Sequence, residues 1–297
     1  MAQKDLIIGA FSNYKDYDVL KPWVQSIKDT DFNGDIVLIA IDTSPELVAR
    51  LESEGVKVLP YAKQNNMMIH MLRFVYIYDY LSKHEKEYRY VITTDVRDVV
   101  FQSNPFGLLD NRVSPGCPAK IVAASEAILI KDEAWNRGNI IKNFGQYFYD
   151  EVKDNPVCNV GVFGGRTRYV RDMCFYIYQL SLNRPDWVAD QAAYNMLLNM
   201  SPWKQATSTA TLATAWALNA HVTSKPDQLD EFGPFLLEER PYMEDGIVRN
   251  SYGLPFSIVH QYDRVPEWTE QIHKKYGINM TNETDIGTSP KYFTYKS

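Results

Sequence analysis

Two aspartates, Asp95 and Asp98, follow an apolar, β-rich run in the sequence YVITTDVRDVVF (residues 90–101). Two carboxylates at the end of a strand supply the hard oxygen ligands that Mg²⁺ and Mn²⁺ prefer, and such an ion suits a phosphate-bearing substrate. In open α/β sheets, ligands bind at the carboxyl ends of the strands. The alternative is a structural role, in which one aspartate ends the strand in a turn and the other pairs with Arg97.

Three later segments also carry residues suited to binding a sugar or a metal. The run NVGVFGG (159–165) is rich in glycine, which lets a backbone approach a ligand closely or forms a β-bulge needed for packing. Asp190 precedes Gln191 at the start of a predicted helix, where it is either an ionised group favoured by the helix dipole or a plain cap. His260 follows a late apolar strand and is either a metal ligand beside carboxylates or a hydrogen-bonded structural histidine.

Strands and helices alternate in the first third of the chain, and this alternation places Asp95 at a sheet edge. Apolar residues at helical spacing predict helices at 18–29, 46–54 and 66–83. Short apolar runs predict strands at 5–12, 35–42, 56–61 and 89–94. Such alternation is typical of a mainly parallel sheet flanked by helices, a Rossmann-like α/β fold. The first strand is not followed by the GxGxxG pattern of dinucleotide-binding proteins, and the Walker pattern is absent too.

The second half predicts a mixed sheet within the same domain. We expect strands and helices there at 121–127, 157–165, 167–182, 190–198 and 256–260, while 212–224 ends in a strand-like ALNAHVT. No repeat or linker divides the chain. We therefore expect one domain over residues 1–278, followed by a polar, loosely ordered tail at 279–297.

Composition excludes several classes of function. The net charge of −6 argues against a nucleic-acid partner, since phosphate contacts need a basic surface. Three cysteines without a CxxC pair indicate neither a disulfide framework nor a zinc site, which is typical of a reducing compartment. The chain does not open with a signal-peptide pattern and has no run of about 18 apolar residues, so we expect a cytoplasmic protein with no membrane span.

The order of these segments resembles that of the GT-A type nucleotide-sugar glycosyltransferases, in particular the glycogenin-like and lipopolysaccharide galactosyltransferase-like retaining enzymes. It is also similar to glycosyltransferase-like proteins that carry D-x-RDVVFQ-x-x-PF, which here spans Asp95 to Phe106. The resemblance covers roughly residues 5–268. It implies a GT-A type mixed sheet with a nucleotide-binding half at about 1–106 and an acceptor half at about 107–278.

The resemblance also implies roles for individual residues. A divalent ion, Mn²⁺ or Mg²⁺, would be bound by Asp95, Asp98 and His260. Arg97 stands where the second aspartate of the family's DxD motif would fall, and the alternative to metal binding by Asp98 is that Arg97 contacts the phosphate instead. Arg73 would reach the donor sugar or the motif aspartates, and its charge predicts a partner such as Asp95. The residues implied at the nucleotide-sugar site are Ala10, Phe11, Ser12, Tyr14, Arg73, Thr94, Asp95, Val96, Arg97 and Arg264. On the acceptor and sugar side they are Asn159, Gly161 and Gly164, and at the reaction centre Asp190, Gln191 and Glu126.

The function implied is transfer of a sugar from a nucleoside diphosphate sugar, with UDP as the favoured nucleotide, to a hydroxyl group of a glycan acceptor. The motif order favours retention of configuration; an inverting enzyme would need a base, for which Asp190 and Glu126 are candidates. A nucleotidyltransferase would want a glycine-rich, basic loop after the first strand, where FSNYKDYD has one lysine and no glycine. A phosphatase of the haloacid dehalogenase type normally carries its aspartates after the first strand, whereas Asp95 follows the fourth predicted strand, which counts against that class. A non-catalytic nucleotide-sugar-binding protein with a degenerate motif also stays open.

Overall fold

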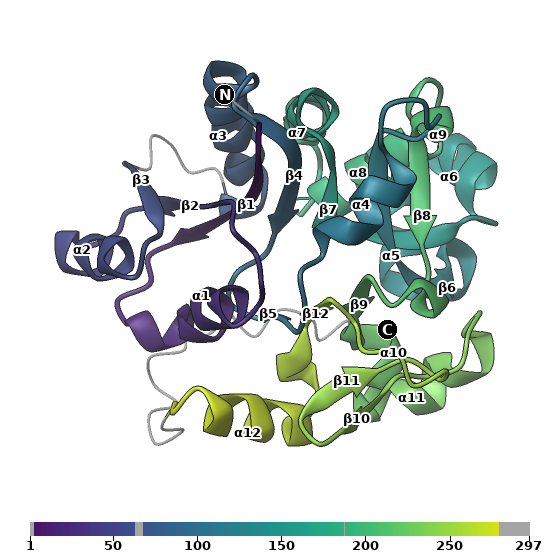
Figure 1. Ribbon diagram of the computed structural model, residues 1–297. Coiled ribbons are helices and arrows are strands. Elements are labelled where there is room, and N and C mark those ends of the chain that lie inside the picture. Colours follow the sequence, from purple (N-terminus) through teal and green to yellow (C-terminus); the bar gives the residue numbers. More distant parts are fainter. Residues whose placement is uncertain (1–2, 63–67, 187, 279–297) are drawn as a thin grey trace.

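The computed structural model describes residues 3–62, 68–186 and 188–278, so the predicted tail at 279–297 and the start of the helix predicted at 66–83 lie outside the described residues. A seven-stranded sheet runs through the centre of the fold in the order β3-β2-β1-β4-β7-β6-β8 (Figure 1). Neighbouring strands are parallel except at β7, which is antiparallel to both β4 and β6. The strands are β1 (Lys4–Ser12), β2 (Asp35–Ile41), β3 (Lys57–Tyr61), β4 (Tyr88–Thr94), β6 (Ile121–Leu129), β7 (Pro156–Arg166) and β8 (Thr207–Ala210).

Helices cover both faces of this sheet, because consecutive strand residues point to opposite faces and both sets are apolar. Ile7 and Ile92 pack with α1 (Lys21–Lys28), α2 (Pro45–Ser53) and α4 (Phe106–Arg112). On the other face, Ile8 and Val91 pack with α3 (Ile69–His84), α7 (Thr167–Ser181) and α8 (Asp190–Leu198). The expected mixed α/β architecture with a mostly parallel, helix-flanked sheet is confirmed.

A second, three-stranded sheet joins distant parts of the chain beside the carboxyl end of β4. It has the order β5-β12-β9, where β12 is antiparallel to β5 and parallel to β9. Its strands are β5 (Val99–Phe101), β9 (Ala217–Asn219) and β12 (Ile258–His260). This sheet brings the end of the aspartate-bearing segment next to two much later segments.

The remaining elements are short. The helices are α5 (Ala134–Phe144), α6 (Gln146–Val152), α9 (Trp203–Ala206), α10 (Ala220–Ser224), α11 (Pro226–Phe232) and α12 (Pro266–Lys275), and a hairpin is formed by β10 (Tyr242–Glu244) and β11 (Ile247–Arg249). No helix within the described ranges is long and apolar enough to cross a membrane.

Two sequence-based boundaries differ from the structure. The first predicted helix splits into a 3₁₀ turn at Tyr17–Val19 and an α-helix that starts at Lys21, because Pro22 fits only the first turn of a helix. The strand-like ALNAHVT is a strand only as far as Asn219 and then becomes α10. Pairing with β12 extends over just three residues of that strand, and the hydroxyl of Thr223 then donates to the carbonyl oxygen of Asn219, one helical turn earlier.

Glycine is required at position 9, where Val96 packs directly over β1. A Cβ at Gly9 would lie 2.3 Å from Cγ1 of Val96 and 3.2 Å from the carbonyl oxygen of Thr94. We expect Gly9→Ala to lower the free energy of unfolding by about 1–3 kcal/mol through overpacking. Chemical denaturation measures this change, and Val96→Ala in the same chain should restore part of the loss.

Gly107 in α4 provides the matched control, since no atom lies within 4 Å of a Cβ built there. Gly107→Ala should be neutral or stabilising, by up to about 1 kcal/mol. Equal effects at the two glycines would mean that contact with Val96 does not restrict position 9.

Candidate functional site

The candidate site begins where β4 ends. Asp95 directly follows Thr94, and its backbone N–H donates to the carbonyl oxygen of Gly161 on β7 at 2.7 Å. The chain then makes a turn of a few residues before β5 starts at Val99. Both aspartates are thereby held at the carboxyl end of a central strand.

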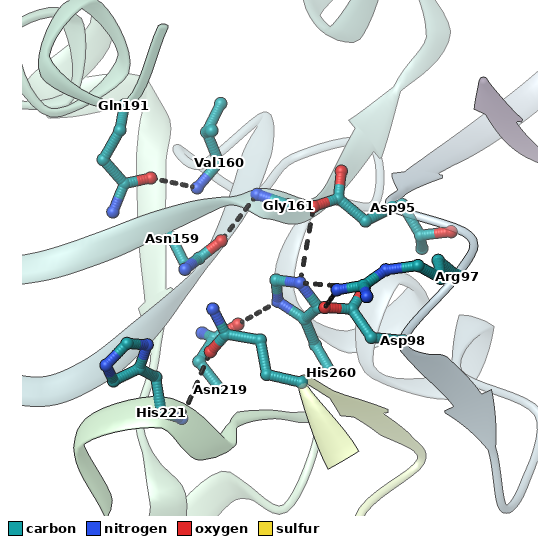
Figure 2. A network of polar contacts seen from close by, with 12 residues as sticks. Asp95, Arg97, Asp98, Asn159, Val160, Gly161, Gln191, Asn219, His221 and His260 are labelled. Carbon is teal, nitrogen blue, oxygen red and sulfur yellow. Dashed lines mark hydrogen bonds and ion pairs between the residues drawn. The ribbon is translucent and has the colours of Figure 1, made fainter. Parts of the chain in front are cut away.

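The small β5-β12-β9 sheet places His260 beside the two aspartates. It is paired with Val99 on β5 and with Asn219 on β9, and the N–H of Gln261 donates to the carbonyl oxygen of Asp98 at 2.7 Å. Its Nε2 lies 3.4 Å from Oδ2 of Asp95 and 3.8 Å from Oδ1 of Asp98 (Figure 2). One possible ligand atom from each of the three side chains lies within 4.8 Å of the others. Octahedral ligands at about 2.1 Å from one ion lie roughly 3–4 Å apart, so this spacing suits a single divalent ion.

Hydrogen bonding determines the tautomer of His260, that is, which ring nitrogen carries the proton and which one presents a lone pair to the carboxylates. The amide nitrogen of Asn219 points to the carbonyl oxygens of Ala124 and Ser125, at 3.4 Å each, which leaves its Oδ1 to accept from Nδ1 of His260 at 2.9 Å. Burial lowers the pKa of His260 despite the nearby charge of Asp98, and this favours the neutral ring. A neutral ring protonated at Nδ1 turns an Nε2 lone pair toward two carboxylates, the arrangement that a metal-binding histidine needs.

Two arginines hold the other oxygen of Asp98. Its Oδ2 lies 3.4 Å from Nη2 of Arg97 and 3.6 Å from Nη2 of Arg264. Both arginines also pair with Asp263, at 3.1 and 2.6 Å, and both remain partly exposed. One oxygen of Asp98 thus faces His260, and the other faces the two arginines.

Arg73 links the aspartate motif to α8. This arginine of α3 is buried and forms ion pairs with Oδ1 of Asp95 and, at 3.2 Å, with Oδ2 of Asp190. The predicted pairing of Arg73 with Asp95 is confirmed. The other oxygen of Asp190, Oδ1, is buried and has no hydrogen-bond partner among the described residues. An unpaired carboxylate oxygen is costly to bury, so Asp190 needs a donor that the described residues do not provide.

Glu126 lies in a network of buried amides. Asn159 donates its amide to Oε1 of Glu126 at 2.6 Å, and Gln191 donates to the same oxygen at 3.3 Å. The carbonyl oxygens of these amides accept from the backbone of β7, from Gly161 at 2.7 Å and from Val160 at 2.8 Å (Figure 2). Burial, with the charge of Glu133 adding to it, raises the pKa of Glu126 to about 7. This carboxyl group therefore changes protonation near neutral pH, as a proton-transfer group must.

A cavity of about 1020 Å³ opens onto many of these groups, but Asp98, Arg97 and Arg264 are not part of its lining. The predicted site residues that line it are Arg73, Asp95, Glu126, Asn159, Gly161, Asp190, Gln191 and His260. Gly161 leaves room for the metal ligands: a Cβ there would lie 2.4 Å from Cε1 of His260, 2.8 Å from Oδ1 of Asn159 and 2.9 Å from Oδ2 of Asp95.

Several residues that the resemblance implied lie elsewhere. The side chains of Phe11 and Val96 belong to the core on the α1 face, and Thr94 accepts a hydrogen bond from Nε1 of Trp23 at 2.9 Å, so none of these side chains faces the cavity. Gly164 packs on Ile92 and does not reach the acceptor side, since a Cβ there would lie 2.8 Å from Cγ1 of that residue. Ala10, Ser12 and Tyr14 lie at or just after the carboxyl end of β1, outside the cavity lining, where the ring of Tyr14 stacks on Phe11 with 5.6 Å between centroids.

The structure also adds residues that the sequence reading missed. They are Asn219, which orients His260, and the cavity-lining residues Glu133, Trp135, Asn136, His221 and Gln261. Burial, together with the charges of Arg264 and Lys225, lowers the pKa of His221 to about 4. Gly145 is a signal for the end of a helix such as α5, but the buried face of α5 is mostly asparagine and gives no apolar period. Nothing local marks Asn219 or His221.

Comparisons with known proteins do not assign the chain to a family: no protein-family model and no curated protein matches it.

Two glycines that line the cavity test the metal geometry. Gly161→Ala inserts a methyl group among the candidate ligands and should weaken Mn²⁺ binding by more than about tenfold, since displaced ligands no longer converge. Gly138→Ala, on α5, is the control, because no atom lies within 4 Å of a Cβ there. Isothermal titration calorimetry with Mn²⁺ measures both. A Gly161→Ala protein that binds Mn²⁺ as tightly as the Gly138→Ala protein would contradict the assignment.

Proposed function

We propose that this chain is a metal-dependent glycosyltransferase that moves a sugar from a nucleoside diphosphate sugar, with a UDP-sugar as the favoured donor, to a hydroxyl group of a glycan. The observation that carries the proposal is the convergence of Asp95, Asp98 and an oriented His260 at a large cavity, which Asp95 and His260 line. The GT-A type resemblance of the sequence and the mostly parallel α/β sheet agree with it. Manganese or magnesium is the ion that a site of two carboxylates and one imidazole suits.

The diphosphate would lie between the metal ligands and the two partly exposed arginines. A divalent ion bound there supplies charge that stabilises the leaving diphosphate. Arg97 and Arg264 approach Oδ2 of Asp98, and each carries further N–H groups that suit phosphate oxygens. Asp98 would thus lie between the metal and the two arginines and hold the arginines in position beside the diphosphate.

The donor sugar would lie against Asp190. Its unpaired, buried Oδ1 accepts a hydrogen bond, which a sugar hydroxyl can donate. Arg73 holds the other oxygen and also pairs with Asp95, so the sugar-binding carboxylate and the metal-binding carboxylate keep a fixed relation. A fixed relation of this kind positions the anomeric carbon relative to the leaving group.

In the reaction, the bond between the anomeric carbon and the diphosphate oxygen breaks, and a bond to the acceptor oxygen forms. The nucleoside diphosphate leaves with the bonding electron pair, and the acceptor hydroxyl loses its proton. Glu126 is the better proton acceptor, since its described hydrogen-bond partners are neutral amides whereas Asp190 is paired with Arg73. The motif order favours retention of configuration, whereas inversion requires a general base such as Glu126, so the anomeric configuration of the product distinguishes the two. A buried carboxyl group that titrates near neutral pH inside the cavity favours an enzyme over a passive sugar-binding protein.

Calorimetry with UDP tests the proposal directly. We expect UDP to bind at least about tenfold more tightly with Mn²⁺ than without it, because the ion joins the carboxylates to the diphosphate. Asp98→Asn should remove most of this difference, whereas Asp263→Asn, which changes a neighbouring carboxylate outside the metal site, should keep it. UDP binding that is absent, or unaffected by Mn²⁺ in the unmodified chain, would contradict the proposal.

The pH dependence of turnover tests Glu126. A base must be deprotonated, so a raised pKa makes the rate fall as pH drops through about 7. Glu126→Gln should remove this limb and lower kcat by about 10²–10⁴-fold. Asp190→Asn, the matched change from carboxylate to amide, should lower the rate but leave the limb in place. Persistence of the limb in Glu126→Gln, or its loss in Asp190→Asn, would assign the proton transfer elsewhere.

A further inference from the structure

One wall of the cavity takes no part in the metal and donor chemistry described so far. It is formed by the start of α5, where Glu133, Trp135, Asn136 and Gly138 line the cavity. Residues of α10 and α11, including His221, Lys225 and Phe232, also line the cavity. The α5 wall combines an aromatic ring with hydrogen-bond acceptors, so it has both features with which proteins recognise amphipathic small molecules.

The indole of Trp135 is available to a ligand. The ring is partly exposed, and among the described residues it has neither a stacked aromatic partner nor a hydrogen-bond partner for Nε1. Gly138, one helical turn further on, leaves open space beside it, with no atom within 4 Å of a Cβ built there. A tryptophan inside a cavity with a free face and a free N–H suits a ligand that presents both C–H groups and hydroxyl groups.

Asn136 supplies an acceptor in a fixed orientation. Its amide nitrogen donates to Oε2 of Glu133 at 2.7 Å, and its backbone N–H donates to the same oxygen at 2.6 Å. The amide therefore cannot flip without facing its oxygen to a carboxylate. Its Oδ1 is buried and has no hydrogen-bond partner in the described part of the chain, so it requires a donor.

We propose that the start of α5 is the acceptor subsite, where Trp135 stacks on a neutral sugar ring of the acceptor and Asn136 accepts a hydrogen bond from one of its hydroxyls. The assignment rests on the proposed glycosyltransferase function, which supplies the need for an acceptor. A neutral ring is favoured because Glu126 and Glu133 line the same cavity, so the carboxylate of an acidic sugar would meet like charge. Trp135 and Asn136 are thus specificity-determining residues rather than catalytic ones.

Binding of simple glycosides tests the subsite without requiring transfer. Saturation-transfer NMR and calorimetry would be run on the full chain with the methyl glycosides of glucose, galactose, mannose and N-acetylglucosamine, and with methyl glucuronide. We expect at least one neutral glycoside to bind more tightly than the glucuronide. Trp135→Ala should weaken that binding by about tenfold, the loss of one good aromatic contact, while Trp135→Phe retains most of it.

The controls separate this proposal from the proposed function. Tyr147→Ala removes an aromatic side chain that is 82% exposed on α6, outside the cavity lining, and should change nothing. Mn²⁺-linked UDP binding should be the same in all three variants. If UDP fails to bind while a neutral glycoside binds through Trp135, the transferase proposal fails and the sugar subsite stands. Equal glycoside binding in Trp135→Ala and the unmodified chain, no binding of any neutral glycoside, or preference for the glucuronide would overturn the subsite.

Discussion

With Nδ1 of His260 donating to Asn219, a lone pair on Nε2 faces carboxylate oxygens of Asp95 and Asp98 at 3.4 and 3.8 Å. Arg73, Arg97 and Arg264 pair with the other oxygens of these carboxylates, but the three acceptor atoms that face one another repel one another unless a cation joins them. Much of the surrounding structure maintains this arrangement: Asn219 fixes the ring, and Gly161 leaves space that a methyl group would fill. Functional sites typically contain an energetically unfavourable arrangement that contacts from the rest of the protein hold in place.

The fold produces the arrangement by joining segments that are far apart in the chain. The central sheet delivers Asp95 and Gly161 to one edge, through β4 and its antiparallel neighbour β7. The small β5-β12-β9 sheet then brings His260 and Asn219 to the same place. Helices α3 and α8 contribute Arg73 and Asp190, which meet across the cavity wall. The proposed division of work, with metal and donor at the edge of the sheet and acceptor at α5, follows from these positions.

Much of the fold could be predicted from the sequence, but the faces of its strands could not. Alternation of strands and helices was readable because each element carries its own period, and the residue types of Asp95, Asp98 and His260 indicated a metal site. In a strand whose two faces are both covered, however, apolar residues occupy every position, so the pattern does not say which side chains reach a ligand. The pattern therefore does not reveal that the side chain of Phe11, on β1, packs in the core on the α1 face. Asn219 and Trp135 were missed because their roles depend on contacts between distant segments.

The most direct measurement is a crystal structure of the chain with Mn²⁺ and UDP, recorded at the manganese absorption edge. The account predicts one anomalous peak within about 2.3 Å of an oxygen of Asp95, an oxygen of Asp98 and Nε2 of His260, with a diphosphate oxygen as a further ligand. A peak at another place, or a bound ion that His260 does not contact, would contradict it.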